Sequence, residues 1–158
     1  HNTLVLNDHN SSEVWSGFRV ARRANIGNRV VGKVSNEQTV EFSAAHDGYK
    51  KQGINCIHHR TWSVSSTDCE IYDVINGEFN SAIGALHLHP DIKVNFVDSS
   101  RCIIHSSDYE IEFEIIGADL SIIDSTWHPG FGIVITSKKL ILQYKQSRVT
   151  YKINWKKL

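Results

Sequence analysis

Strict alternation of apolar and polar residues is the feature that most constrains how this chain can fold. Residues 109–116 read Tyr-Glu-Ile-Glu-Phe-Glu-Ile-Ile, with glutamate at every second position until the closing pair of isoleucines. In a β-strand, successive side chains point to opposite faces, so this segment has one apolar face and one charged face. It therefore predicts a strand of an antiparallel sheet that buries one face and exposes the other.

Strand-like segments of this kind follow one another along the whole sequence. They lie at 3–6, 14–23, 29–35, 39–45, 56–64, 69–75, 82–89, 92–97, 102–105, 120–124, 132–136, 140–144 and 149–155. Turn-forming residues separate them, and the pair Asn76-Gly77 is a strong signal for a tight turn. No segment keeps a helical period. We predict an all-β fold, an antiparallel β-sandwich of two large sheets with no substantial helix, in which residues 1–158 form one domain.

Charge and hydropathy exclude two classes of partner. Lys and Arg together number 17, as do Asp and Glu, so the formal net charge is zero. A non-specific nucleic-acid binder needs a basic excess, and no apolar run is long enough to span a bilayer. The chain begins at His1 and contains no Met. We interpret it as a mature fragment or an excised domain whose targeting information is missing.

Three cysteines, Cys56, Cys69 and Cys102, are present without C-x-x-C spacing. An odd number cannot pair completely. We expect them to be small buried apolar side chains, with one disulfide in an oxidising compartment as the alternative.

A basic and aromatic segment at 14–23 suggests a surface for acidic sugars. If the segment is a single strand, period two places Trp15, Arg19 and Arg23 on one face. An aromatic plane beside guanidinium groups can bind a carboxylate or sulfate. The alternative is a solvated outer face on which the arginine stems cover part of Trp15.

Nine histidines give the chain several candidate metal ligands. His87 and His89 are two residues apart, which suits two imidazoles on one metal, as in the cupin jelly rolls. However, Ser81 and Lys93 stand where a cupin would have Gly and Glu, so a cupin-type metalloenzyme is a weaker hypothesis. The alternative is that both histidines hydrogen-bond in the sheet or line a groove.

Several short motifs, in this order, resemble the C-terminal domain of heparinase II/III-like polysaccharide lyases. The resemblance covers residues 1–140, and its motifs are His1-Asn2-Thr3-Leu4-Val5-Leu6-Asn7, Ser12-Glu13-Val14-Trp15, Gly17-Phe18-Arg19-Val20, His46-Asp47-Gly48-Tyr49, His59-Arg60, His87-Leu88-His89-Pro90 and Phe131-Gly132.

The resemblance implies a β-sandwich joined to a helical α/α-toroid, which is not in this chain. It also implies cleavage of a uronic-acid-containing polysaccharide, a glycosaminoglycan or alginate, by β-elimination. The Tyr and His that act as base and acid come largely from the helical domain, so we expect this fragment alone to be inactive. Alginate-lyase relatives place a catalytic Tyr before the second metal histidine, and no Tyr lies between His1 and His46.

The same resemblance implies a zinc site in the sandwich, formed by two histidines and a carboxylate. The matching residues are His1 and His46, and Glu13 is our choice for the carboxylate. The resemblance further implies a periplasmic location. The alternative function is a non-catalytic module that binds carbohydrate or supports the neighbouring domain.

Overall fold

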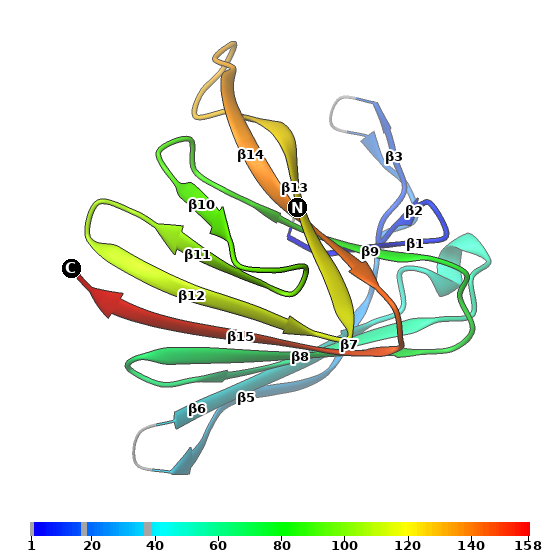
Figure 1. The fold of residues 1–158 in the computed structure, drawn as a ribbon. Helices are drawn as coiled ribbons and strands as arrows, with labels where there is room; N and C mark the ends of the chain where they lie inside the picture. The colour runs from blue at the N-terminus through cyan, green and yellow to red at the C-terminus, as the bar shows by residue number, and fades with distance from the viewer. Residues whose placement is uncertain (1, 17–18, 37–38) are drawn as a thin grey trace.

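Two antiparallel sheets make up the computed structural model, which describes residues 2–16, 19–36 and 39–158 (Figure 1). The larger sheet has eight strands, in the spatial order β10 (Lys93–Phe96), β11 (Arg101–His105), β12 (Tyr109–Ile116), β15 (Arg148–Lys157), β8 (Asp68–Asn76), β7 (Ile57–Val64), β6 (Thr39–His46) and β5 (Ile26–Asn36). The smaller sheet has five, in the order β13 (Ala118–Trp127), β14 (Ile135–Tyr144), β9 (Ala82–His87), β1 (Leu4–Leu6) and β2 (His9–Asn10).

Two small elements complete the described fold. A two-stranded ribbon pairs β3 (Val14–Ser16) with β4 (Arg19–Val20), and a single 3₁₀ turn, η1, spans Lys50–Gln52. The predicted antiparallel β-sandwich without substantial helix is confirmed. Within the described residues, no helix is long and apolar enough to cross a membrane.

The core lies between the two sheets. Leu4 and Leu6 of β1 and Leu140 and Leu142 of β14 are fully buried on the inner face of the smaller sheet. They belong to one cluster with side chains of the larger sheet, among them Ile75, Phe113, Ile115, Val149 and Tyr151. Burying each leucine contributes about 1.5–3 kcal/mol, so this cluster is the main source of the stability of the sandwich.

The chain crosses between the sheets at Asn76-Gly77, because β8 belongs to the larger sheet and β9 to the smaller. The sequence predicted a tight turn here, and the backbone does turn, with Gly77 at φ 127°. It does not form a hairpin, however. A Cβ at Gly77 would lie 2.2 Å from the carbonyl oxygen of Asn55, so the crossing requires glycine.

Two predicted strand boundaries were wrong in ways that matter for the site. The segment 14–23 forms two strands, β3 and β4, that pair antiparallel with Val14 opposite Val20. The segment 82–89 ends as a strand at His87. Both errors have one cause, since alternation shows that a segment is extended but not where the chain reverses or leaves the sheet.

A third error is that two predicted strands, 132–136 and 140–144, were separated. Residues 135–136 of the first and all of the second belong to one strand, β14, because the polar residues between them pair with β13. Lys138, for example, lies opposite Asp124, and its Nζ is 3.1 Å from the carboxylate.

The three cysteines are all free thiols. Cys56 and Cys102 are buried, as expected, and Cys69 is half-buried.

Candidate functional site

Three neighbouring strands of the larger sheet bring together a cluster of ionisable side chains. His46 ends β6 and lies opposite His58 of β7, while Arg60 of β7 lies opposite Asp73 of β8. His58 and Arg60 are two residues apart on one strand, so they share a face. The paired register therefore places all four side chains on one face of the sheet, and Arg60 also donates from Nη1 to the backbone carbonyl of Asn2, just before β1.

Asp73 is the centre of this cluster and has no solvent-exposed surface. Arg60 donates from Nε to Oδ1 and from Nη2 to Oδ2, both at 2.6 Å. Tyr144, from the smaller sheet, and Tyr151 donate to Oδ2. Burial alone would raise the pKa of Asp73, but the hydrogen bonds and charges of Arg60 and His58 hold it well below its usual range. Asp73 is therefore ionised and fully hydrogen-bonded.

Two histidines connect this buried carboxylate to the surface. His58 is 4% exposed, and its Nε2 lies 2.9 Å from Oδ1 of Asp73. Its Nδ1 lies 3.2 Å from Nε2 of His46. Burial, together with the neighbouring His58, lowers the pKa of His46 to about 4, so His46 is neutral at pH 7.

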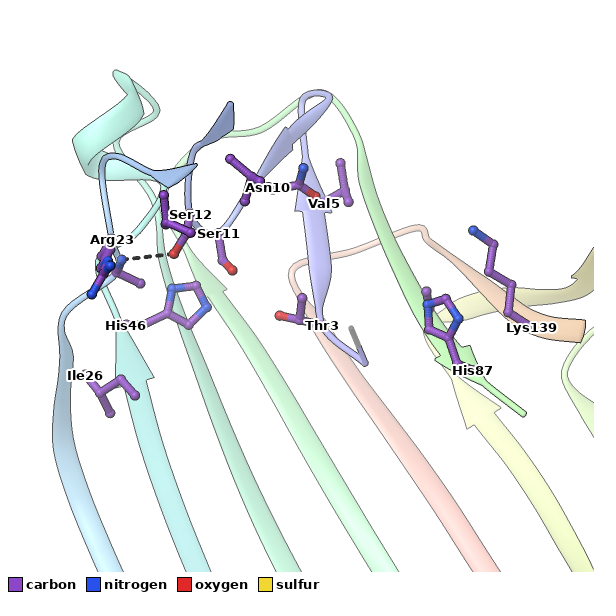
Figure 2. A pocket seen from close by; sticks show the side chains of 14 residues that line it. Thr3, Val5, Asn10, Ser11, Ser12, Arg23, Ile26, His46, His87 and Lys139 are labelled. Atoms are coloured by element: carbon purple, nitrogen blue, oxygen red, sulfur yellow. Dashed lines mark hydrogen bonds between the residues drawn. The ribbon is translucent and has the colours of Figure 1, made fainter. Parts of the chain in front are cut away.

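A cleft of about 750 Å³ opens beside His46, with lining residues from the smaller sheet on one side and from the segment between Ser11 and Ile26 on the other (Figure 2). We call it the basic cleft. Arg23, His46, His87 and Lys139 line it, and none of its described lining residues is Asp or Glu. Partial burial, together with nearby positive charge that includes Lys139, lowers the pKa of His87. The two permanent cations can attract an anion, and the two imidazoles can exchange hydrogen bonds with it.

Only one of the three predicted sugar-binding residues lines this cleft. Arg23 lines it, whereas Trp15 on β3 and Arg19 on β4 are exposed and are not among its lining residues. The prediction that these three share one strand face was wrong, because the chain reverses between β3 and β4. Their role in binding sugar stays a prediction.

The predicted zinc ligands are only partly described. His46 lines the basic cleft, and its neutral imidazole suits zinc. Glu13 accepts a hydrogen bond from Nε1 of Trp15 at 3.0 Å and lies 3.5 Å from Nε of Arg22. His1 lies outside the described residues. Among the residues that the structure describes, no group of three or more His, Cys, Asp or Glu is placed to hold a metal ion.

The predicted pairing of His87 with His89 on one strand face was also wrong. Because β9 ends at His87, the two side chains do not sit two apart on a strand. His87 lines the basic cleft. His89 instead lies against Trp127, with ring centroids 4.6 Å apart, and 3.5 Å from a carboxylate oxygen of Asp91.

Sequence reasoning missed His58, Asp73 and Tyr144 as members of a site. One signal was available, since Asp73 is the one charged residue in the run Ile-Tyr-Asp-Val-Ile at 71–75. A carboxylate in a buried strand needs a cationic or hydrogen-bonding partner. The sequence could not say that the partners would come from β7 and from the opposite sheet.

Comparison with known proteins gives a match over nearly the whole chain. The family model described as heparinase II/III-like, C-terminal, matches residues 1–156. No curated protein sequence is significantly similar to this chain.

Solved structures share the fold at low sequence identity. Heparan sulfate lyase HepC from Pedobacter heparinus superimposes with a TM-score of 0.74 at 12% identity, and a mutant of it with 0.75 at 12%. Heparinase III, the BT4657 gene product with methylated lysines, gives a TM-score of 0.68 at 13% identity. Each match covers 100% of this chain and 24%, 24% and 23% of the respective structures, so the chain spans about a quarter of their length.

Proposed function

Because the chain belongs to the heparinase II/III-like family through its C-terminal domain, we propose that it is the β-sandwich of a polysaccharide lyase. The intact protein would cleave a uronic-acid-containing polysaccharide by β-elimination. In that reaction the uronate carboxylate is neutralised, the C5 proton is removed and the leaving O4 is protonated. The observation that carries the proposal is the basic cleft.

The cleft favours an acidic ligand because positive charge is concentrated in it. The chain as a whole has no net charge, yet Arg23 and Lys139 line the cleft and its described lining contains no carboxylate. Such a site attracts carboxylates and sulfates, whereas a neutral sugar gains nothing from its net charge. In the proposed function these cations hold the acid groups of the glycan, while the base and acid come from the helical domain.

Glycan binding by the 158-residue chain tests this proposal. Heparan sulfate oligosaccharides should bind more tightly than a neutral glycan of the same length. Arg23→Gln or Lys139→Gln should each weaken binding roughly tenfold to a hundredfold if the contact is desolvated. Lys152→Gln, on β15 and paired with Glu114, is the matched control. Equal affinity for acidic and neutral glycans would contradict the proposal.

Trp15 and Arg19 stay proposed contacts of the glycan outside the cleft. They lie on the exposed β3–β4 ribbon, next to Val14 and Val20, which do line the cleft. Arg19→Gln in the intact enzyme should raise KM for the polymer and leave the melting temperature unchanged. A fall in melting temperature at constant KM would show that Arg19 is structural instead.

We also propose that His1, His46 and Glu13 hold a zinc ion. We further propose that the intact protein is periplasmic. When bound, zinc would supply a fixed positive charge at the cleft. His46→Ala should then lower the zinc content of protein purified without chelators, and His59→Ala should not. Equal zinc content in both variants would remove His46 from the site.

A specific observation favours the alternative function of interdomain support. The connection between β13 and β14 exposes a run of apolar side chains, with Phe131 fully exposed and Ile133 and Val134 more than half exposed. In Figure 1 this hairpin extends beyond the two sheets. Exposed apolar groups of this kind commonly mark a contact surface. If the intact protein keeps activity in Arg23→Gln and Lys139→Gln but loses stability in Phe131→Ser, support is the better description.

A further inference from the structure

A second pocket, of about 250 Å³, adjoins the basic cleft on the face of the larger sheet that carries Arg60. The two hollows share the lining residues Thr3, Ile26 and His46, all labelled in Figure 2, so they are contiguous. Beyond these shared residues the second pocket extends to Trp62 of β7. We call it the tryptophan pocket.

The tryptophan pocket exists because a small residue stands between larger ones. On β6, Phe42, Ala44 and His46 follow one another at two-residue steps, so they share a face. Ala44 lies opposite Arg60 of β7, and Phe42 lies opposite Trp62. The single methyl group of Ala44 leaves a hollow beside Arg60 and Trp62. The guanidinium of Arg60 lies 5.9 Å from the ring centroid of Trp62.

The permanent charge beside this pocket is already matched. Arg60 forms two hydrogen bonds with the carboxylate of Asp73, and its Nη1 donates to the backbone carbonyl of Asn2 at 3.2 Å. None of the described lining residues is Asp, Glu or Lys. The pocket therefore offers an indole surface without the unpaired cations of the basic cleft. The C–H bonds of a sugar ring carry partial positive charge and pack well against the negative face of an indole.

We propose that Trp62 forms a second glycan subsite, in which the indole packs against the C–H face of a sugar ring while the basic cleft holds acid groups on neighbouring units. That the ligand is an acidic glycan rests on the proposed function. On β7, Trp62 is four residues beyond His58, which lies opposite His46, so the subsite is about 13 Å from the junction of the two pockets. A disaccharide held in the basic cleft is too short to reach it.

Affinities for two lengths of heparan sulfate oligosaccharide test the subsite in the 158-residue chain. Trp62→Leu removes the indole, and Ala44→Leu fills the pocket while keeping Trp62. Each variant should bind a hexasaccharide about fivefold to tenfold more weakly than the wild type does. Both should bind a disaccharide with unchanged affinity, because the disaccharide stays in the basic cleft.

The matched control is Tyr72→Leu, which removes an aromatic ring that is 37% exposed on the opposite face of the larger sheet. This variant should bind both oligosaccharides as the wild type does. Wild-type affinity for the hexasaccharide in Trp62→Leu or Ala44→Leu would overturn the subsite. An equal loss for the disaccharide would overturn it too, because the loss would then come from a change in the fold.

The subsite and the proposed function fail in different ways. Because the subsite needs no acid group, a neutral hexasaccharide at high concentration should shift the indole N–H signal of Trp62 in nitrogen-15 NMR spectra, but not in Ala44→Leu. If acidic and neutral glycans bind equally, the proposed function fails while this shift still decides the subsite. If acidic glycans bind preferentially and the Trp62 signal moves with neither glycan, the subsite is overturned and the proposed function stands.

Discussion

Arg60 is the residue on which the buried cluster most depends. Its side chain is 13% exposed, and its guanidinium forms two hydrogen bonds with Asp73, which is not exposed at all. Removing one partner of a buried ion pair leaves an uncompensated charge, which costs about 3–5 kcal/mol. We expect Arg60→Met to lower the free energy of unfolding by about that amount, measured in urea.

The control for this prediction is Arg101→Gln, which breaks the exposed pair of Arg101 with Asp98. Exposed pairs are screened by solvent, so little change is expected. A comparable loss of stability in the two variants would mean that burial is not what makes the Arg60 pair important.

Asp73 should also make stability depend on pH. Its folded pKa lies below the ordinary 3.8. As the pH falls through 3.8, Asp73 becomes protonated in the unfolded chain but stays ionised in the folded protein. Proton uptake therefore stabilises the unfolded state, and the free energy of unfolding falls. Thermal unfolding between pH 5 and pH 2.5 should therefore show a shallower acid loss in Asp73→Asn than in the wild type. Identical slopes would assign the acid sensitivity to other carboxylates.

At the scale of the elements, the crossings between sheets decide how the sandwich closes. Gly77→Ala would push a Cβ to 2.2 Å from the carbonyl oxygen of Asn55 at a φ of 127°. Overpacking costs about 1–3 kcal/mol, and the left-handed backbone adds about 1–2 kcal/mol. Gly32 also has a positive φ, 62°, but a Cβ there would have no atom within 4 Å. Gly32→Ala should therefore lower the free energy of unfolding only by the backbone contribution.

Denaturant unfolding of the two glycine variants separates steric crowding from backbone strain. The expected order of stability is wild type, then Gly32→Ala, then Gly77→Ala. If Gly77→Ala were as stable as Gly32→Ala, the β8–β9 crossing would have to be able to shift away from Asn55.

At the scale of the whole molecule, the chain is about a quarter of the length of the structures that share its fold. A two-walled active site loses its positioned base and acid when one wall is removed. We expect the 158-residue chain alone to produce no unsaturated uronate from heparan sulfate, followed by ultraviolet absorbance. Product formation that disappears in Arg23→Gln would show that this chain carries the catalytic groups itself.

The sequence by itself determined the fold class, because alternation is a local property. Tyr109–Ile116 was predicted with its observed bounds, and most other strands within a few residues. The motifs also pointed to the family and to His46, which lines the basic cleft. Arg23 lines it too, although the single-strand argument that selected Arg23 was wrong. Each of these inferences needed only neighbouring residues.

Only the tertiary structure decided which strands pair, where the chain changes sheet and what surrounds His46. Asp73 is reached by Arg60 and His58 from the neighbouring strand and by Tyr144, 71 residues further along, from the opposite sheet. Period two fixes the face on which a side chain lies but not the strand beside it. The cluster behind His46 depends on register and on the packing of two sheets, and these are set by the core as a whole rather than by any one segment.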